Sequence, residues 1–431
     1  MKISRRLVVA SALIFAAVAP ALFVVSKRNL AIAAAPALDP AILAEIRPAL
    51  DDEVRKGLRA GFVAGVVARD GETYIVAAGM ADREHNLPMT ADSRFRIASM
   101  TKPVVTAAIM QLVDRGVLNL SDPISRFVPA FADARVALSQ EPDERGVIPT
   151  RPASRPITIH DLLTHTAGIG YVFDRQSALD RLYVDANLFT TGGTLVERID
   201  RIARLPLYND PGKEWRYSYA LDVAGYLIEA ATGEPLEAYL EKNLFAPLRM
   251  NDTEFFFDRS DFDRVAAVYE FAKDGTLSRA GANGVSGNLN EQGFGVVSGG
   301  AGLVSSAPDY LRFCLMMLRG GEVDGVRVLS AEAVRRMMSD QLAPGASGRL
   351  WEHASSTFGL GGTVVVHPEL ADGVAVAGEW GWTGFWDTWF IVNPVDGVAA
   401  VLLAQTAPGP EVPASQAREI VKAAAYRAAA G

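Results

Sequence analysis

The chain has 431 residues, of which 49% are hydrophobic, and it carries a formal net charge of −8. This length and apolar fraction suffice for one large domain, or two closely joined ones, with a substantial core. Because the charge is negative and no long basic run follows residue 28, we exclude nucleic acid as a partner. The single cysteine, Cys314, lies in an apolar segment, so we expect a small core residue and no intrachain disulfide.

Residues 1–35 have the composition of an export signal. Lys2, Arg5 and Arg6 precede an apolar run over residues 7–25, and the segment ends in an alanine-rich tail. This order is typical of a cleaved signal peptide, and the tail favours that interpretation over an uncleaved membrane anchor. An exported chain without disulfides fits a bacterial periplasm. We therefore expect export, with membrane contact only through this segment if it stays uncleaved.

Hydrophobic spacing and turn residues define the elements that follow the signal. Apolar residues at helical spacing predict helices, and β-rich runs on both sides of Asp70-Gly71 predict a hairpin. Four prolines and several charges indicate a surface excursion over residues 140–157. In chain order, these elements are a helix over 41–58, strands over 62–68 and 72–79, a helix that begins near Ser99 and stops at Gly116, the surface excursion, and a short buried helix that Gly168 ends.

The second half of the chain is helical before it returns to β-type sequence. In chain order, it predicts helices over 219–231, 236–248 and 308–319, strands over 363–366, 374–377, 388–392 and 398–403, and a last helix over 415–428. Strands at both ends with helices between them predict one sheet formed by both termini, with a helical region inserted, in the α/β (α+β) class. We expect an α/β subdomain over 36–104 and 305–431, and a mostly helical inserted subdomain over 105–304.

Ser99-Met100-Thr101-Lys102 is the first segment that could carry chemistry. A serine and a lysine three residues apart on a helix share one face, which brings the amine within reach of the hydroxyl. A serine becomes nucleophilic when a base takes its proton, and a lysine can be that base where burial and nearby positive charge keep it neutral. The positive end of the helix favours the developing alkoxide. Alone, the motif is a weak signal, because such tetrapeptides arise by chance in many chains and an N-cap serine beside a solvated lysine is the more ordinary interpretation.

Two further segments could contribute to such a site. Tyr217 could carry a proton if a lysine lies near its phenol, although a half-buried tyrosine with a solvated hydroxyl is the ordinary alternative. The second segment is Trp380-Gly381-Trp382-Thr383-Gly384-Phe385-Trp386-Asp387-Thr388. Its glycines would let a substrate approach the backbone of an edge strand, whose N–H groups could bind an oxyanion. Its tryptophans could form an aromatic wall or pack in the core.

Several familiar motifs are missing from the sequence. It contains no Gly-x-Ser-x-Gly elbow and no His-Glu-x-x-His. The five histidines are scattered, and His160 and His165 are five residues apart, which is a poor spacing for shared metal ligation on a helix. The glycine-rich stretch over 293–302 has no following Gly-Lys-Ser/Thr, so a phosphate-binding loop is not indicated. We expect neither a metal nor a cofactor.

Taken together and in this order, the segments resemble the serine β-lactamase/penicillin-binding-protein superfamily over residues 40–430. The most similar branch is the class C-type group that includes the family VIII carboxylesterases. The matches are Ser99-Met100-Thr101-Lys102 with Ser-x-x-Lys, Tyr217-Ser218-Tyr219 with Tyr-x-Asn, Trp382-Thr383-Gly384 with Lys/His-Thr-Gly or the Trp-Gly-Gly of the esterases, and the segments 162–168 and 299–303 with signatures that we interpret as structural. The resemblance implies a β-lactamase/transpeptidase-like fold with an antiparallel sheet flanked by helices.

The resemblance also implies roles for the matched residues. Ser99 would be acylated, and Lys102 and Tyr217 would move protons in acylation and deacylation. Which of these two groups is the general base stays open, because they are expected to titrate together. The backbone N–H groups of Ser99 and Phe385 would form the oxyanion hole. The remaining residues expected around the substrate are Trp382, Thr383, Gly384 and Tyr219.

Two positions depart from the lactamase pattern. Tyr219 stands where an asparagine would hold the amide side chain of a lactam, and Trp382 stands where a cation would meet the carboxylate of a lactam or peptide. Without that cation an ionic substrate loses a charge-assisted contact of roughly 1.5–3 kcal/mol, and a bulky apolar group suits a neutral ester. We therefore expect an exported serine hydrolase that cleaves carboxylic esters through an acyl-enzyme.

Other functions remain open at this point. The same residues would serve a β-lactamase, a D-Ala-D-Ala carboxypeptidase, an amidase, or an acyltransferase that passes the acyl group to an alcohol. A non-catalytic member that binds cell-wall or lipid ligands would be expected to lose Ser99, Lys102 or Tyr217, and this chain keeps all three. The expected partner is a small-molecule ester, β-lactam or amide. The sequence leaves the acyl chain length, the alcohol and the oligomeric state open.

Overall fold

The computed structural model describes residues 37–173, 175–186, 188, 194–257, 259–280, 297–348 and 354–430. The predicted export signal over 1–35 lies outside the described residues and stays a prediction. Residues 293–296 of the glycine-rich stretch over 293–302 lie outside them too. No helix among the described residues has the length and apolar content needed to span a bilayer.

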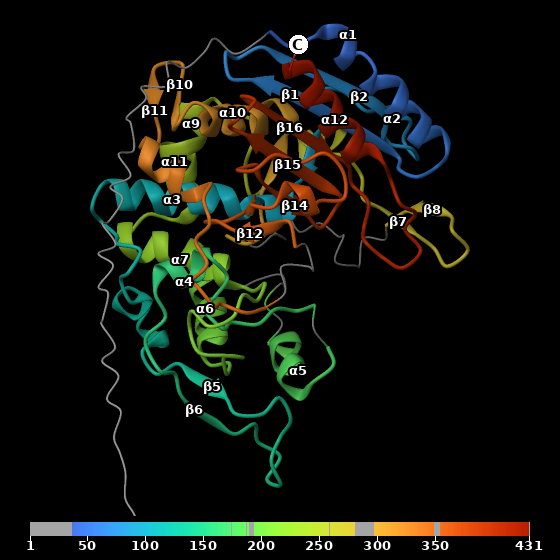
Figure 1. Ribbon diagram of the computed structural model, residues 1–431. Coiled ribbons are helices and arrows are strands. Elements are labelled where there is room, and N and C mark those ends of the chain that lie inside the picture. Colours follow the sequence, from blue (N-terminus) through green and yellow to red (C-terminus); the bar gives the residue numbers. More distant parts are fainter. Residues whose placement is uncertain are drawn as a thin grey trace, which may run out of the picture. The chain divides into compact units, whose positions relative to one another are not determined.

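An eight-stranded antiparallel sheet joins the two ends of the chain, and Figure 1 shows the strands of both ends side by side. Its order is β12-β13-β14-β15-β16-β1-β2-β3. The strands are β1 (Gly61–Ala68), β2 (Thr73–Asp82), β3 (Leu87–Pro88), β12 (Ser356–Phe358), β13 (Thr363–Val365), β14 (Trp380–Gly384), β15 (Thr388–Asn393) and β16 (Val398–Leu403). The join is the β1–β16 pair, in which Val66 lies opposite Ala400. This confirms the predicted sheet formed by both termini.

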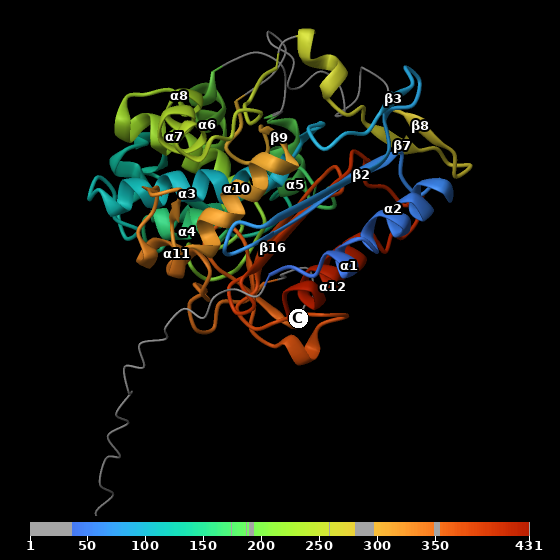
Figure 2. The ribbon, with the colours of Figure 1, turned by 90° about the horizontal axis from the view of Figure 1, so that it is seen from above.

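Both faces of the sheet are covered by helices, which explains the continuously apolar sequence of β1. On one face lie α1 (Pro40–Leu43), α2 (Ile46–Arg55) and α12 (Ala417–Ala430), and on the other lies α10 (Ala307–Leu318), as Figure 2 shows. Phe62 and Val66 pack in the core under α1, α2 and α12, whereas Val63 and Val67 pack in the core on the side of α10. A strand buried on both sides needs apolar residues at every position. At Gly65 a Cβ would lie 2.6 Å from Leu311 of α10, so glycine allows the close approach of this helix.

The inserted region between the two parts of the sheet is helical, as predicted. Its elements are β4 (Arg94–Arg96), η1 (Ala98–Met100), α3 (Thr101–Asp114), η2 (Ile124–Arg126), η3 (Pro129–Phe131), β5 (Arg135–Ala137), β6 (Thr150–Pro152), α4 (Ile159–Leu163), α5 (Ala178–Asp185), α6 (Leu195–Ala203), α7 (Ala220–Thr232), α8 (Leu236–Leu240), η4 (Glu241–Phe245), α9 (Ala246–Leu248), η5 (Arg259–Arg264), β7 (Tyr269–Phe271), β8 (Leu277–Arg279) and β9 (Val304–Ser306). After it come α10, β10 (Glu322–Val323), β11 (Val326–Arg327), α11 (Ala331–Met337) and the final strands, with η6 (Pro368–Leu370) among them. The boundaries placed at 104 and 305 stay a prediction.

Several predicted elements differ from the structure. The helix expected over 41–58 is divided into α1 and α2, and the one over 236–248 contains the π-helical turn η4. No strand forms over 374–377. The chain turns at the following Gly378, which takes a φ of +86°, and then enters β14. The short helix within 158–168 ends at Leu163, before the left-handed residues His165 and Gly168. Cys314 is fully buried in α10, as expected.

Candidate active site

Ser99 lies in the 3₁₀ turn η1, directly before α3 rather than within it. The preceding residue, Ala98, takes a φ of +44°, a left-handed conformation that a non-glycine residue adopts only where its surroundings enforce it. Ile97 supplies this constraint, because its N–H donates to Leu303 O at 3.0 Å and its carbonyl accepts from Thr388 Oγ1 at 3.2 Å. These two hydrogen bonds connect the turn of Ser99 to the segment before β9 and to β15, and so hold the turn in place.

Two proton-carrying groups meet on the Ser99 hydroxyl. Lys102 Nζ donates to Ser99 Oγ at 3.1 Å, as the three-residue spacing predicts, and Tyr217 OH donates to the same oxygen at 2.6 Å. The Lys102 amine also lies 4.6 Å from the centre of the Tyr217 ring. Lys102 has no exposed surface. The tertiary structure therefore brings together the serine, lysine and tyrosine that the sequence singled out.

A carbonyl oxygen on the far side of Lys102 fixes its amine in place. Lys102 Nζ donates to Gly300 O at 2.6 Å. The loop that carries Gly300 is held by Asp222 in the first turn of α7, whose Oδ1 accepts from Ser298 Oγ at 2.5 Å and from the Gly300 N–H at 3.3 Å. A Cβ on Gly300 would lie 2.5 Å from Asp222 Oδ2, so only glycine fits between the carboxylate and the lysine.

An aromatic cluster holds the ring of Tyr217. Its ring centre lies 4.8 Å from that of His165, 5.2 Å from that of Tyr171 and 5.7 Å from that of Trp382. His165 is fully buried, with its Nδ1 3.0 Å from Ser218 Oγ. Burial, and then the charge of Lys102, lower the pKa of His165 well below its ordinary value, so its ring is neutral at neutral pH. A neutral ring can pack behind Tyr217 without adding charge to the site.

Trp382 and Tyr219, which were expected against the substrate, are nearly fully buried. Trp382 packs on Phe358 and Tyr217, and Tyr219 packs on Tyr171 with ring centres 4.4 Å apart. Neither lines the pocket that contains Ser99. In the structure the side chain of Trp382 contacts Tyr217, which itself lines the pocket, and a direct substrate contact by Trp382 or Tyr219 stays a prediction.

The strand expected to bind an oxyanion has a different place in the sheet. β14 was expected at an edge, but it lies between β13 and β15. Its pairing with β13 ends at Gly381, so the residues up to Gly384 run past the end of β13 toward the turn of Ser99. At Gly384 a Cβ would lie 2.3 Å from Ile97 O and 2.0 Å from Thr388 Oγ1. Glycine is therefore required to bring Phe385 beside Ser99.

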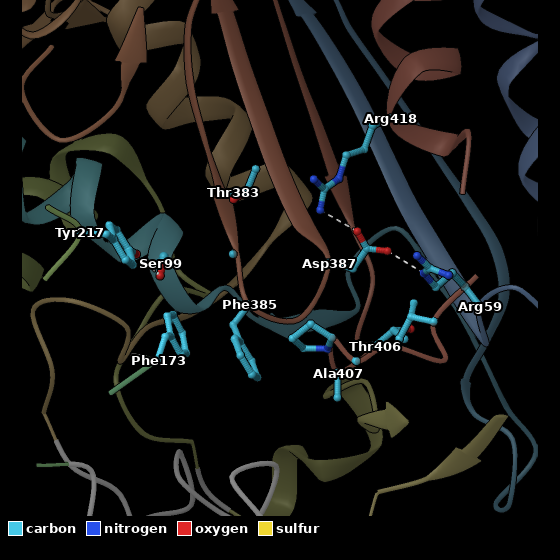
Figure 3. Close-up of a pocket in the computed structure, with 14 residues that line it drawn as sticks. Arg59, Ser99, Phe173, Tyr217, Thr383, Phe385, Asp387, Thr406, Ala407 and Arg418 are labelled. Atoms are coloured by element: carbon cyan, nitrogen blue, oxygen red, sulfur yellow. Dashed lines mark hydrogen bonds and ion pairs between the residues drawn. The ribbon is translucent and has the colours of Figure 1, made fainter. Parts of the chain in front are cut away.

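A pocket of about 330 Å³ opens at Ser99. Tyr217, Thr383, Gly384 and Phe385 line it together with the serine, so five of the predicted site residues share one cavity. Figure 3 shows Tyr217 beside Ser99, with the rings of Phe173 and Phe385 below them and a group of charged side chains beyond. The two phenylalanine rings stack with centres 5.8 Å apart and planes 10° apart.

Several residues of the site were not predicted from the sequence. They are Phe173 and Tyr171 in the loop after α4, Asp222 in α7, and the pocket residues Arg59, Asp387 and Arg418. Asp222 lies five residues after Tyr217, inside the helix predicted over 219–231, so an acidic residue in the first turn of a mostly apolar helix was an available signal. The others come from four separate parts of the chain. Asp387 lies in the segment over 380–388 that was singled out, but its local sequence does not indicate that two arginines pair with it.

No group of three or more His, Cys, Asp or Glu side chains within the described ranges is arranged to hold a metal ion. The chemistry available from the described side chains is that of a serine with a lysine and a phenol beside it. Such a constellation can activate a hydroxyl for attack on an acyl carbon and can return the proton to a leaving group.

The fold and this constellation define the class of protein. A family model described as Beta-lactamase matches residues 46–425. The chain therefore belongs to the β-lactamase family and is a serine hydrolase of that family, as the resemblance of its motifs indicated.

Three of the similar proteins are esterases or hydrolases by name. Esterase EstB of Burkholderia gladioli is 34% identical over 388 residues, which cover 86% of this chain and 92% of EstB. The lovastatin esterase of Penicillium rubens is 31% identical over 332 residues, which cover 73% of this chain and 80% of the esterase. Among solved structures, EstCE1, a hydrolase with promiscuous acyltransferase activity, matches with a TM-score of 0.72 and 26% identity, over 90% of this chain and 98% of EstCE1.

Proposed function

We propose that the protein hydrolyses carboxylic esters of small molecules through an acyl-enzyme on Ser99. The observation that carries the proposal is the meeting of Lys102 Nζ and Tyr217 OH on Ser99 Oγ, inside a pocket that an acyl group can enter. The esterase activity of EstB and of the lovastatin esterase supports an ester as the substrate.

In the proposed acylation, Ser99 Oγ forms a bond to the carbonyl carbon while its proton passes to the Lys102–Tyr217 pair. The carbonyl oxygen becomes an oxyanion, which the backbone N–H groups of Ser99 and Phe385 bind. The bond from carbon to the alcohol oxygen then breaks, and the alcohol leaves with the proton from Tyr217. In deacylation a water repeats these steps, so that the acid leaves and Ser99 recovers its proton.

The surroundings of Tyr217 favour an ester over a β-lactam. A lactam or a D-alanyl peptide carries a carboxylate next to the bond that breaks, and a cation beside the tyrosine would meet it. In this chain the matched position is Trp382, an uncharged side chain that packs on the Tyr217 ring. A carboxylate there would lose its solvation without gaining a charged partner.

The test is a comparison of p-nitrophenyl butyrate with nitrocefin, using the wild type, Ser99→Ala and the matched control Ser278→Ala. Ser278 is an exposed serine in β8 that does not line the pocket. We expect ester turnover in the wild type and the control, loss of turnover in Ser99→Ala, and slow or no hydrolysis of nitrocefin. Labelling of Ser99 by a fluorophosphonate, located by mass spectrometry, would identify the acylated residue.

Fast nitrocefin hydrolysis would instead identify a β-lactamase. Turnover of neither substrate, with no fluorophosphonate adduct on the folded protein, would contradict the proposal and favour a binding function. Acyl transfer is a second candidate, favoured by the description of EstCE1 as a hydrolase with promiscuous acyltransferase activity. It would be recognised by a new ester formed from the acyl-enzyme when an alcohol is added, measured against the free acid.

A further inference from the structure

The pocket of Ser99 contains an ion cluster that the proposed mechanism does not use. Asp387, in the turn between β14 and β15, accepts from Arg59 Nε at 2.6 Å and from Arg418 Nη2 at 2.6 Å. Arg59 lies just before β1 and Arg418 lies in the first turn of α12, so three distant parts of the chain build the cluster. All three residues line the same cavity as Ser99, and Figure 3 shows both ion pairs.

This cluster carries a surplus positive charge. Burial alone would raise the pKa of Asp387, but the charges of Arg418 and Arg59 outweigh it and the pKa lies below its ordinary value. Asp387 is therefore ionised at neutral pH, and two guanidinium groups share one carboxylate. Within the described part of the chain, Asp387 is the sole acidic partner of either arginine. A second anion would balance the remaining charge.

The two arginines have different freedom to bind that anion. Arg59 is 6% exposed, and its Nη1 donates to Leu58 O at 2.5 Å and to Pro413 O at 3.3 Å, so its position is fixed. Arg418 donates to Asp387 through Nη2, and 36% of its side chain is exposed. A guanidinium has five N–H donors in a planar fork, which suits a second carboxylate beside the first. The cluster is thus a built site with donors that face the cavity.

The position of the cluster assigns it to one side of the substrate. In Figure 3, Tyr217 lies on one side of Ser99, and Arg418 and Arg59 lie on the other side, beyond Phe385. Because Tyr217 returns the proton to the alcohol in the proposed mechanism, the alcohol lies on its side and the acyl group extends toward the arginines. The acyl group first passes the stacked rings of Phe173 and Phe385. It would therefore be apolar in the middle and meet positive charge at its end.

We propose that Arg418, supported by Arg59, binds a carboxylate at the far end of the acyl group, so that the preferred substrates are half-esters of dicarboxylic acids. This inference rests on the proposed ester hydrolysis and specifies its substrate class. It differs from recognition of a carboxylate beside the leaving group, where this chain has Trp382. A charge-assisted, bidentate contact at the end of an apolar chain also fixes the chain's length and orientation.

The experiment uses esters that differ only at the end of the acyl chain. p-Nitrophenyl hexanoate and mono-p-nitrophenyl adipate form one matched pair, and the octanoate and the suberate form the other, with a carboxylate in place of the terminal methyl group. For the wild type we expect kcat/KM to be roughly tenfold higher for the diacid ester in at least one pair, which corresponds to about 1.4 kcal/mol. Added salt should reduce this ratio, because it screens a half-exposed charge.

The variant Arg418→Gln should bring the ratio of diacid to neutral ester close to one. Its matched control is Arg427→Gln on the same helix, where Arg427 pairs with Glu45 at the surface and 55% of its side chain is exposed. The control should keep the wild-type ratio. If Arg418 only holds the turn of Asp387 in place, Arg418→Gln will slow both esters equally and leave the ratio unchanged, which would overturn the proposal.

A binding measurement separates this inference from the proposed hydrolysis. Titration calorimetry on Ser99→Ala with adipate and with hexanoate requires no turnover, and we expect adipate to bind roughly tenfold more tightly in a manner that Arg418→Gln abolishes. Equal binding of the two acids would overturn the inference even if esters are hydrolysed. Turnover of the neutral esters without a diacid preference would do the same, whereas turnover of no ester combined with tight adipate binding would overturn the hydrolysis alone.

Discussion

Removal of the phenol oxygen of Tyr217 is the smallest change that tests the proposed proton path. Tyr217→Phe removes the group that donates to Ser99 Oγ at 2.6 Å and leaves the ring in place. The contacts of the ring with His165, Tyr171 and Trp382 do not involve the oxygen, so the packing around the site should be preserved. Ser99 also keeps its 3.1 Å hydrogen bond from Lys102. The substitution therefore removes the hydrogen bond and the proton-carrying function of the hydroxyl, while the ring contacts remain.

The expected effects on stability and on rate differ in size. Loss of one hydrogen bond at a half-buried tyrosine should lower the free energy of unfolding by about 0.5–1.5 kcal/mol. A group that transfers protons in the transition state contributes a factor of about 10²–10⁴ in rate, or about 2.7–5.4 kcal/mol of activation free energy. A loss of kcat that far exceeds the loss of stability would therefore identify a role in the chemical step.

The assay is stopped-flow release of p-nitrophenol from p-nitrophenyl butyrate, with urea unfolding of the same protein samples. The burst reports acylation and the steady rate reports deacylation, and both should fall if Tyr217 acts in both steps. Tyr226→Phe is the control, because Tyr226 is a partly buried tyrosine on α7 that does not line the pocket. If Tyr217→Phe kept kcat/KM within about threefold of the wild type, Tyr217 would have to be removed from the proton path.

Two further predictions concern the support of the site. Gly384→Ala would place a Cβ 2.3 Å from Ile97 O, so β14 would have to move away from the turn of Ser99. We expect kcat to fall by roughly tenfold or more, together with a lower Tm. An unchanged kcat would show that Phe385 does not need the close contact between β14 and this turn. The pKa of His165 lies well below 6.5 in the folded protein. Below about pH 6.5 the unfolded chain therefore binds a proton that the folded chain does not. As the pH falls further, the free energy of unfolding decreases by up to about 1.4 kcal/mol per pH unit. His165→Asn, which tolerates the φ of +54°, should reduce this slope between about pH 6.5 and 5 in urea unfolding; an unchanged slope would mean that His165 is protonated in the folded state.

Local sequence was sufficient where the chemistry depends on neighbours in the chain. The three-residue spacing of Ser99 and Lys102 places their polar atoms together in any helical turn, and the structure has them 3.1 Å apart. The hairpin at Asp70-Gly71 and the apolar strands on both sides of it formed for the same reason. In these cases the interacting residues are only a few positions apart, so the local sequence pattern determines how they are arranged.

Spacing along the chain could not place groups that meet only in the folded protein. Tyr217 was selected through its resemblance to a motif, and its contact with Ser99 spans 118 residues of sequence. The place of β14 was predicted wrongly because a glycine-rich strand is typical of an edge, whereas here the glycines admit the turn of Ser99 and the side chain of Thr388. Trp382 was expected to contact the substrate, and this stays a prediction. What the sequence could not show is that its side chain is buried against Tyr217 and Phe358.

The sequence by itself determined the family, the sheet formed by both ends of the chain, and the serine with its lysine. These depend on periodicity, short spacing and motif order, which are properties of the chain. The tertiary structure alone decided that Arg59, Asp387 and Arg418 meet at the end of the pocket, and that Asp222 holds the carbonyl that binds Lys102. These contacts join residues that are 31 to 328 positions apart in the sequence, and only the packing of the folded chain brings them together.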